Sequence, residues 1–391
     1  MRTWHLPLSL SLALASFACD DSDEPQGGAP TELPATYTFP SPFADGADSV
    51  AYSGQTARLV LVHALVDHIE GLTDRLDEGS LVPAAGDVVA ELAFYYRFDS
   101  ETAGDLAHGL ETTPAPAQQT FAAISGGKDL AGKLAGNDPV GQHKDWSTDF
   151  AGWGAPGSTT PEALLEGWFA ALEAQAVARA NGDLPMGPDG QPIALVHVSP
   201  EGLNYAELIE KFLGVALAFS QGVDDYLDDD LEGKGLNAPN TRDGNEPFSV
   251  LAHAWDEGFG YFGAARNYGD FSDDEIAGAG GREGWATGAH DANGDGAIDL
   301  TAEINLGHAV NAAKRDRGAT SGLDLTGQAW EGFRRGRAII HAAGETLTAD
   351  EKAALQAARD QAVAAWEQAI MATVVHYINE VLADTAAFGT P

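Results

Sequence analysis

The sequence is poor in cysteine and in basic residues, and each shortage excludes a class of protein. One of the 391 residues is cysteine, which excludes an internal disulfide, a cysteine-based zinc site and a CxxC redox motif. Lys and Arg number 21 against 59 Asp and Glu, so the formal net charge is -38. Because so negative a surface repels nucleic acid and anionic lipid headgroups, we expect neither nucleic-acid partners nor peripheral membrane binding.

Long apolar runs are also scarce. The N-terminal run, residues 6–17, is shorter than the roughly 20 residues that a membrane-spanning helix needs. It follows the basic residue Arg2 and leads to Ala18 and Cys19, an arrangement typical of a lipoprotein signal peptide. We therefore predict that residues 1–18 are removed and that Cys19 carries the lipid. The alternative is an ordinary signal peptide with a chance cysteine.

This N-terminus predicts an exported lipoprotein, anchored by lipid in the bacterial cell envelope, at the periplasm or the cell surface, with no transmembrane helix. Residues 19–36 are acidic and rich in Pro and Gly, as in a flexible tether. Residues 37–391 then form the folded domain.

Helical periodicity dominates that domain. The sequence predicts an all-α fold, a single large helical domain with long Gly/Asp-rich loop insertions; two packed bundles are the alternative. Start signals stand at Thr160-Pro161, Ser199-Pro200 and the capping box from Thr348 to Glu351. The best strand candidate is 193–198. Helices are expected over residues 53–75, 86–97, 115–135, 160–181, 199–226, 247–267, 301–315, 326–343 and 349–384.

The insertion at residues 268–300 contains a calcium-type motif. Its oxygen donors alternate, and a glycine stands sixth, where an EF-hand loop turns sharply. The apolar eighth residue, Ile298, is expected to pack inward. The predicted ligands at positions one, three, five, seven and nine are Asp291, Asn293, Asp295, the carbonyl of Ala297, and Asp299.

The motif departs from an EF-hand loop at its twelfth position, which is Ala302. Glu303 follows one residue later and is the candidate to complete the loop. Without a bidentate acid, the dissociation constant is expected near the extracellular range of about 10⁻⁴–10⁻³ M. The alternative is a solvated acidic turn in an acidic protein.

A second candidate metal site lies in the aromatic-rich helix. His253, Asp256 and Glu257 stand at i, i+3 and i+4 and share one helical face. With His376 from the last helix, they predict a site for iron or zinc. The alternative is a buried polar network that pairs these groups with the arginines at 334, 335 and 337.

Catalytic signatures are missing from the sequence. HExxH, Gly-x-Ser-x-Gly, a P-loop and a dinucleotide fingerprint are all absent, so no catalytic residue is assigned. A metallopeptidase using His253, Glu257 and His376 remains a rival hypothesis.

Six segments form a recognisable series in the order 52–58, 202–211, 253–257, 258–263, 333–340 and 376–379. The most specific of them is His253-Ala254-Trp255-Asp256-Glu257. Together they resemble the DUF4856 family of bacterial envelope lipoproteins. The resemblance covers residues 37–385 and implies a helical protein of the cell envelope.

The same helix more weakly resembles imelysin-like proteins, which are helical, extracytoplasmic and associated with iron acquisition. Their GxHxxE motif is matched by His253, whereas Leu251 replaces the glycine and Asp256 the glutamate. The resemblance implies a role in iron uptake.

Together these observations predict an extracytoplasmic cation-binding lipoprotein in metal (iron) uptake or handling. Its expected partners are metal ions and envelope proteins. A structural or partner-binding lipoprotein without a transition metal is the main alternative, and it predicts a large exposed apolar patch.

Overall fold

The computed structural model describes residues 32–138, 142, 144–188, 190–320 and 322–387. Cys19 and the predicted signal peptide lie outside these residues. In the part described, the chain is helical with only isolated β-bridges, so the prediction of an all-α fold is confirmed. The helices are α1 (Ser53–Glu70), α2 (Leu72–Asp77), α3 (Asp87–Tyr96), α4 (Ser100–Ala103), α5 (Phe121–Ile124), η1 (Ala131–Lys133), α6 (Trp146–Asp149), α7 (Pro161–Ala180), α8 (Tyr205–Leu213), η2 (Gly214–Phe219), η3 (Gly222–Tyr226), η4 (Gly235–Asn237), α9 (Val250–Phe262), η5 (Tyr268–Asp270), α10 (Asp273–Ile276), α11 (Gly307–Asp316), α12 (Leu325–Ala342) and α13 (Ala349–Ala387).

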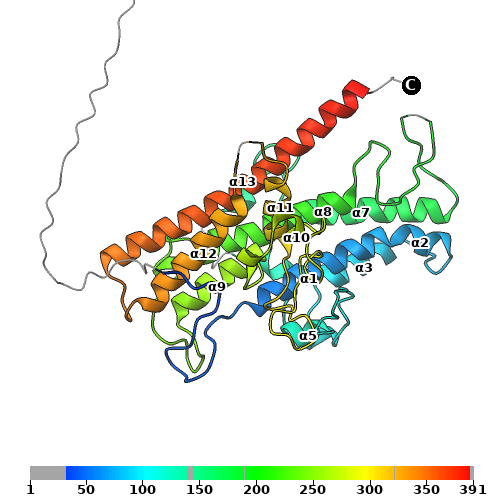
Figure 1. The fold of residues 1–391 in the computed structure, drawn as a ribbon. Coiled ribbons are helices and arrows are strands. Elements are labelled where there is room, and N and C mark those ends of the chain that lie inside the picture. The colour runs from blue at the N-terminus through cyan, green and yellow to red at the C-terminus, as the bar shows by residue number, and fades with distance from the viewer. Residues whose placement is uncertain (1–31, 139–141, 143, 189, 321, 388–391) are drawn as a thin grey trace, which may run out of the picture.

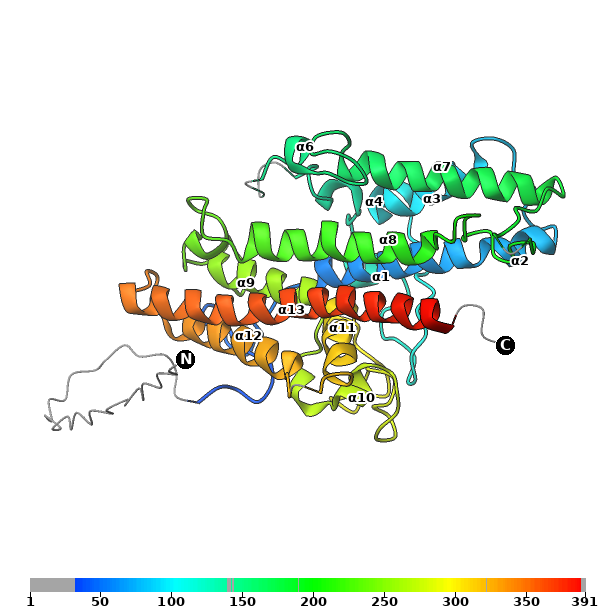
Figure 2. The same ribbon diagram turned by 90° about the horizontal axis from the view of Figure 1, so that it is seen from above.

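The long helices form a layered bundle. In Figure 1, α12 lies along α13, and α9 lies beside α12. Figure 2 shows α7, α8 and α13 running in roughly parallel directions, with α7 and α1 each packed against α8. The loops around α10, which carry the calcium-type motif, lie on one flank of this body near the middle of the long helices.

Two of the three predicted helix starts are confirmed. Thr160 caps α7, its hydroxyl accepting a bond from the Ala163 N–H at 3.1 Å. Before α13, the Thr348 N–H donates to the Glu351 carboxylate at 2.7 Å, and the Glu351 N–H donates to the Thr348 hydroxyl at 3.2 Å. This reciprocal pair is the predicted capping box.

The start predicted at Ser199 is wrong. The helix begins at Tyr205, and Asn204 caps it by accepting the N–H groups of Ala206 and Glu207. Gly202 has a φ of +87°, a left-handed conformation that interrupts a helix. Residues 199–203 therefore form a turn around the Ser199 hydroxyl.

Two other segment predictions also fail. Residues 193–198 form no strand, and their one pairing is the isolated bridge from Val198 to Asn204. Within 115–135 only α5 and the short η1 are helical, because Pro116 lacks an N–H donor and Gly127 has a φ of +64°.

The helix that begins at α8 changes its winding. After Leu213 it continues through the π-helical turns η2 and η3 to Tyr226. Gly222 lies against α13 here, since a Cβ at this position would stand 2.7 Å from Trp366. π-Helical turns are rare and are frequently found at functional sites.

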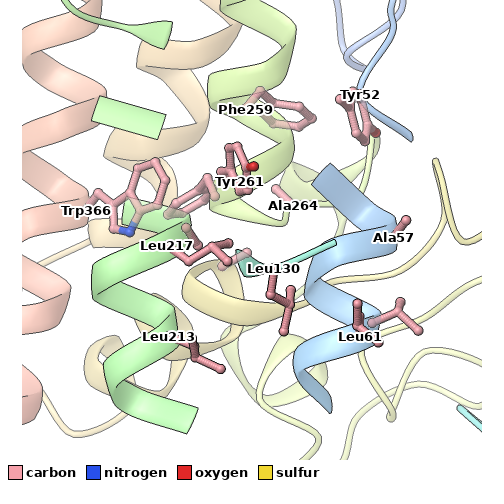
Figure 3. Close-up of a cluster of buried hydrophobic side chains, with 14 of the residues drawn as sticks. Tyr52, Ala57, Leu61, Leu130, Leu213, Leu217, Phe259, Tyr261, Ala264 and Trp366 are labelled. Atoms are coloured by element: carbon pink, nitrogen blue, oxygen red, sulfur yellow. The ribbon is translucent and has the colours of Figure 1, made fainter. Parts of the chain in front are cut away.

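The core joins the long helices of the bundle. Figure 3 shows Leu61 of α1, Leu213 of α8, Tyr261 of α9 and Trp366 of α13 within one cluster of buried side chains. Trp366 is fully buried. Burying an aromatic side chain removes about 150–250 Å² from water, which stabilises the fold by about 4–6 kcal/mol before entropy is counted.

Candidate functional site: the 291–303 loop and the α9 face

The calcium-type loop has the turns that its glycines predict. Gly294 and Gly296 have φ values of +75° and +91°, which other residues rarely adopt. The Asp291 carboxylate accepts the N–H groups of Gly294 at 2.7 Å, Asp295 at 3.1 Å and Gly296 at 2.9 Å. Asn293 accepts the Asp295 N–H at 2.8 Å. The predicted first, third and fifth ligands therefore lie on one tight turn.

Glu303 closes this loop. Glu303 is 4% exposed, and one oxygen of its carboxylate accepts the N–H groups of Ala292 and Asn293 at 3.0 and 3.1 Å. The other oxygen accepts the Asp299 N–H at 2.9 Å. Glu303 thus bridges the beginning and the end of the loop, close to the place where an EF-hand loop needs its last acid.

The far side of the loop is fastened to another segment. Ile298, the eighth residue, is fully buried, as predicted. Its N–H donates to the Ala115 carbonyl at 3.0 Å, and its carbonyl accepts the Ala117 N–H at 2.8 Å. The Gln118 amide donates to Asp299 and accepts the Leu300 N–H, each at 2.9 Å. These hydrogen bonds therefore fix the position of the loop relative to residues 115–118.

The donor set fits calcium in kind. Every candidate ligand in the loop is an oxygen, which suits a hard cation better than zinc or iron(II). The Asp295 carboxylate accepts only the Ala297 N–H, at 3.0 Å, among the bonds described, so it keeps lone pairs for an ion. The Oδ1 oxygen of Asp299 accepts three hydrogen bonds, one from the Gln118 amide and two from the N–H and hydroxyl of Thr301. This oxygen therefore has less capacity left for an ion than the Asp295 carboxylate.

The α9 face does not gather its predicted metal ligands. Asp256 is fully buried, and one oxygen accepts the Tyr37 hydroxyl at 2.7 Å and the Arg337 Nε at 2.9 Å. Its other oxygen accepts the Ala51 N–H at 3.3 Å. Arg337 also donates to the Ser49 hydroxyl at 2.7 Å and carbonyl at 3.1 Å.

This pair has the properties of a structural centre. Burial raises the pKa of the Asp256 carboxyl, and the Arg337 charge opposes that rise. Removing one member of a buried ion pair costs about 3–5 kcal/mol, because the other charge stays behind without its partner. Asp256 therefore joins α9 to α12 and to the entry segment at Tyr37.

His253 and Glu257 lie at the edge of this centre. The His253 Nδ1 is 3.7 Å from an Asp243 oxygen, and its Nε2 is 3.8 Å from a Glu257 oxygen. Glu257 also accepts the Gln55 amide at 2.8 Å. His253 thus stands between two carboxylates, one beside each ring nitrogen. None of the described arginine contacts reaches His253, whereas Asp256 does pair with Arg337.

His376 belongs to a different place on the molecule. Its Nε2 lies 3.0 Å from Glu380 on the exposed part of α13, and its ring contacts Tyr377. Among the described residues, the one group of three acids or histidines whose ligand atoms lie within 4.8 Å of one another is Asp228, Asp229 and Asp230, so no three acids of the 291–303 loop are drawn together to that distance. In that group, Asp229 is already held by Arg359 and Gln356.

Sequence reasoning missed a buried polar cluster beside α9. Asp225, on the π-helical turn η3, is 7% exposed, and its nearest described cation is Lys133 at 4.0 Å. Burial raises its pKa to about 6, while Lys133 opposes the rise. Burial likewise raises the pKa of Tyr261 on α9, beside Arg58. The only signal in the sequence was the pair Asp224-Asp225 at the end of an apolar run.

The comparisons with known proteins are negative: no family model, curated protein or solved structure matches this chain. Across the described residues, no helix is both long and apolar enough to cross a membrane.

Proposed function

We propose that this protein is a calcium-binding helical lipoprotein of the cell envelope, without enzymatic activity, in which the ion fastens the 291–303 loop to the helical body. The observation that carries the proposal is the position of Ile298. Buried and hydrogen-bonded to residues 115–117, it couples order in the loop to the core. The neighbouring bonds from Leu306 to Gly263 and from Arg266 to Ala302, both 2.7 Å, extend that coupling to the end of α9.

The proposed role of calcium is structural. The acids of the loop repel one another in a chain of net charge -38, and a bound cation relieves that repulsion. We do not extend the proposal to iron or zinc, because Asp256 is engaged by Arg337 and Tyr37 and His376 lies with Glu380 instead.

Thermal unfolding with and without calcium tests this proposal. With a dissociation constant near 10⁻⁴ M, about 10 mM calcium would stabilise the fold by about 2.7 kcal/mol, seen as a rise of a few degrees in Tm. Asp295→Ala should abolish that rise. Asp183→Ala, which removes the same charge from an exposed loop, should retain it.

Magnesium at the same concentration separates binding from charge screening, since it demands a stricter octahedral site. Equal rises in Tm with both ions, or a rise that survives in Asp295→Ala, would contradict the calcium site.

The lipid anchor is the second part of the proposal, and it rests on the sequence around Cys19. Expressed in a bacterium that processes lipoproteins, the full chain should enter the membrane fraction and incorporate labelled palmitate. Cys19→Ser should lose the label and appear in the soluble fraction. A labelled Cys19→Ser chain, or an unlabelled parent chain, would disprove the anchor.

A further inference from the structure

The C-terminal part of α13 exposes a dense set of large apolar side chains. Figure 1 shows these last turns rising away from α7 and α8. The side chains are between 47% and 63% exposed, whereas an ordinary soluble surface carries such residues singly. We call this set the outer stripe: Met371, Val374, Val375, Ile378, Val381 and Leu382.

The outer stripe lies on the opposite side of α13 from the face that packs on the body. Ala362, Trp366 and Ala369 are buried on the packed face. With about 100° of rotation per residue, that face continues through Thr373, which bonds to Asn311 at 2.9 Å, and then through His376. The face turned toward the body therefore becomes polar, while the apolar residues turn outward, where α11 and α12 cannot cover them.

The spacing of the outer stripe is that of a helix–helix contact. Residues 371, 374, 378 and 381 alternate steps of three and four, the seam along which two helices pack. A helix lying on a lipid surface instead carries a wider apolar face bordered by Lys and Arg. Residues 368–387 contain no Lys or Arg.

We propose that the outer stripe binds the outer stripe of a second copy of this chain, as an antiparallel pair of α13 helices. A two-fold symmetric contact uses the same patch on both copies, so one stripe is sufficient. From the exposed fractions, the six side chains offer roughly 600 Å² per copy, close to the roughly 800 Å² that each partner buries in a stable interface.

The lack of charge on the outer stripe permits this occupant. Two chains of net charge -38 repel each other, so they can meet most easily along an uncharged surface. The acids within 368–387 are Glu380 and Asp384, and both lie on the His376 side of the helix, away from the stripe. A strongly basic or acidic partner would find no complementary charge there.

Sedimentation equilibrium of the chain from residue 20 onward, which keeps every described element, tests the pairing. From about 1 to 50 μM, a range suited to a micromolar dissociation constant, the parent chain should reach twice the mass of one copy. The double variant Ile378→Glu with Leu382→Glu should remain at the mass of one copy. The control, Val82→Glu with Leu184→Glu, changes two exposed apolar residues elsewhere and should still dimerise.

Circular dichroism must show that the Glu variants keep the parental helix content, as expected for exposed positions. A second test uses the fact that this chain has no cysteine after Cys19. Single cysteines placed in turn at 374, 378 and 381 should yield a disulfide-linked dimer at one or more positions, and Val82→Cys should not.

A parent chain that stays at the mass of one copy throughout the range overturns the proposal, as does a dimer that persists in the Ile378→Glu, Leu382→Glu variant. A single-copy chain that floats with phosphatidylcholine vesicles, but not after these substitutions, would assign the stripe to lipid instead.

Discussion

At the scale of single residues, two buried acids at or beside α9 differ in how their negative charge is compensated. Asp256 accepts three hydrogen bonds, one of them from the Arg337 guanidinium, so its charge is compensated inside the protein. Among the described cations, the nearest to Asp225 is Lys133, at 4.0 Å, and Lys133 is shared with Asp138. Burial therefore disfavours the charged form of Asp225.

Asp225→Asn should stabilise the protein at neutral pH. Folding raises the pKa of Asp225 from 3.8 to about 6, so the stability linked to its protonation is present below pH 3.8 and is lost as the pH rises through about 6. A shift of this size corresponds to about 2–3 kcal/mol at pH 7. Urea unfolding between pH 4 and 7.5 should show the variant gaining on the parent as the pH rises.

Asp183→Asn, on an exposed loop, is the matched control. Its free energy of unfolding should differ from that of the parent by the same amount at every pH. If the difference in free energy of unfolding between Asp225→Asn and the parent is also independent of pH, the charged form of Asp225 is stable in the fold, and a further cation must compensate its charge.

At the scale of helices, glycine sets how closely α12 approaches its neighbours. A Cβ at Gly332 would stand 2.8 Å from the Ala362 nitrogen of α13, and one at Gly336 would stand 2.0 Å from the Trp255 ring of α9. Trp255 also donates to the Phe333 carbonyl at 3.0 Å, so the ring cannot withdraw without breaking a buried hydrogen bond. These contacts place α12 between α9 and α13, where Arg337 can reach Asp256.

Alanine should therefore have opposite effects at two helical glycines. Gly336→Ala gains about 1 kcal/mol of helix propensity but forces overpacking that typically costs about 1–3 kcal/mol or more, so we expect net destabilisation. Gly167→Ala in α7 meets no atom within 4 Å and should stabilise the protein by up to about 1 kcal/mol. Denaturant unfolding of the two variants measures both effects, and a stabilising Gly336→Ala would refute the close approach.

At the scale of the whole molecule, the dominant feature is the net charge of -38. Self-repulsion of like charges opposes the compact state, and salt weakens it as the Debye length falls to about 10 Å at 0.1 M. The two proposals respond differently to this field: a bound calcium ion relieves the repulsion, whereas pairing brings two negative chains together, so pairing should strengthen as salt screens their charge.

The melting temperature should accordingly rise between about 10 and 150 mM monovalent salt, equally for NaCl and KCl, because screening does not depend on the identity of the ion. At matched ionic strength, calcium should add a further rise in the parent chain but not in Asp295→Ala. A melting temperature that falls with NaCl would show that attractive ion pairs, such as those of Arg97 and Arg75, outweigh the repulsion.

Much of the helical fold could be predicted from local patterns. The caps at Thr160 and Thr348 act within four residues, so the sequence alone is sufficient to place α7 and α13. The Ser199 signal failed because Gly202 turns the chain before a helix can begin. The turn at 291–296 was predictable for the same reason, since its glycines and Asx side chains bond to N–H groups two to five residues away.

The sequence by itself thus determined the all-α class, the acidic character and the form of the calcium-type loop, because these depend on composition and on contacts between near neighbours. Only the tertiary structure decided which charges are compensated. The partner of Asp256 lies 81 residues away in the chain, and the segment that anchors Ile298 comes from another part of the fold. Burial and long-range packing select such partners: the sequence could offer the arginines at 334, 335 and 337 as alternatives to a metal at this helical face, but only the structure shows that Arg337 binds Asp256.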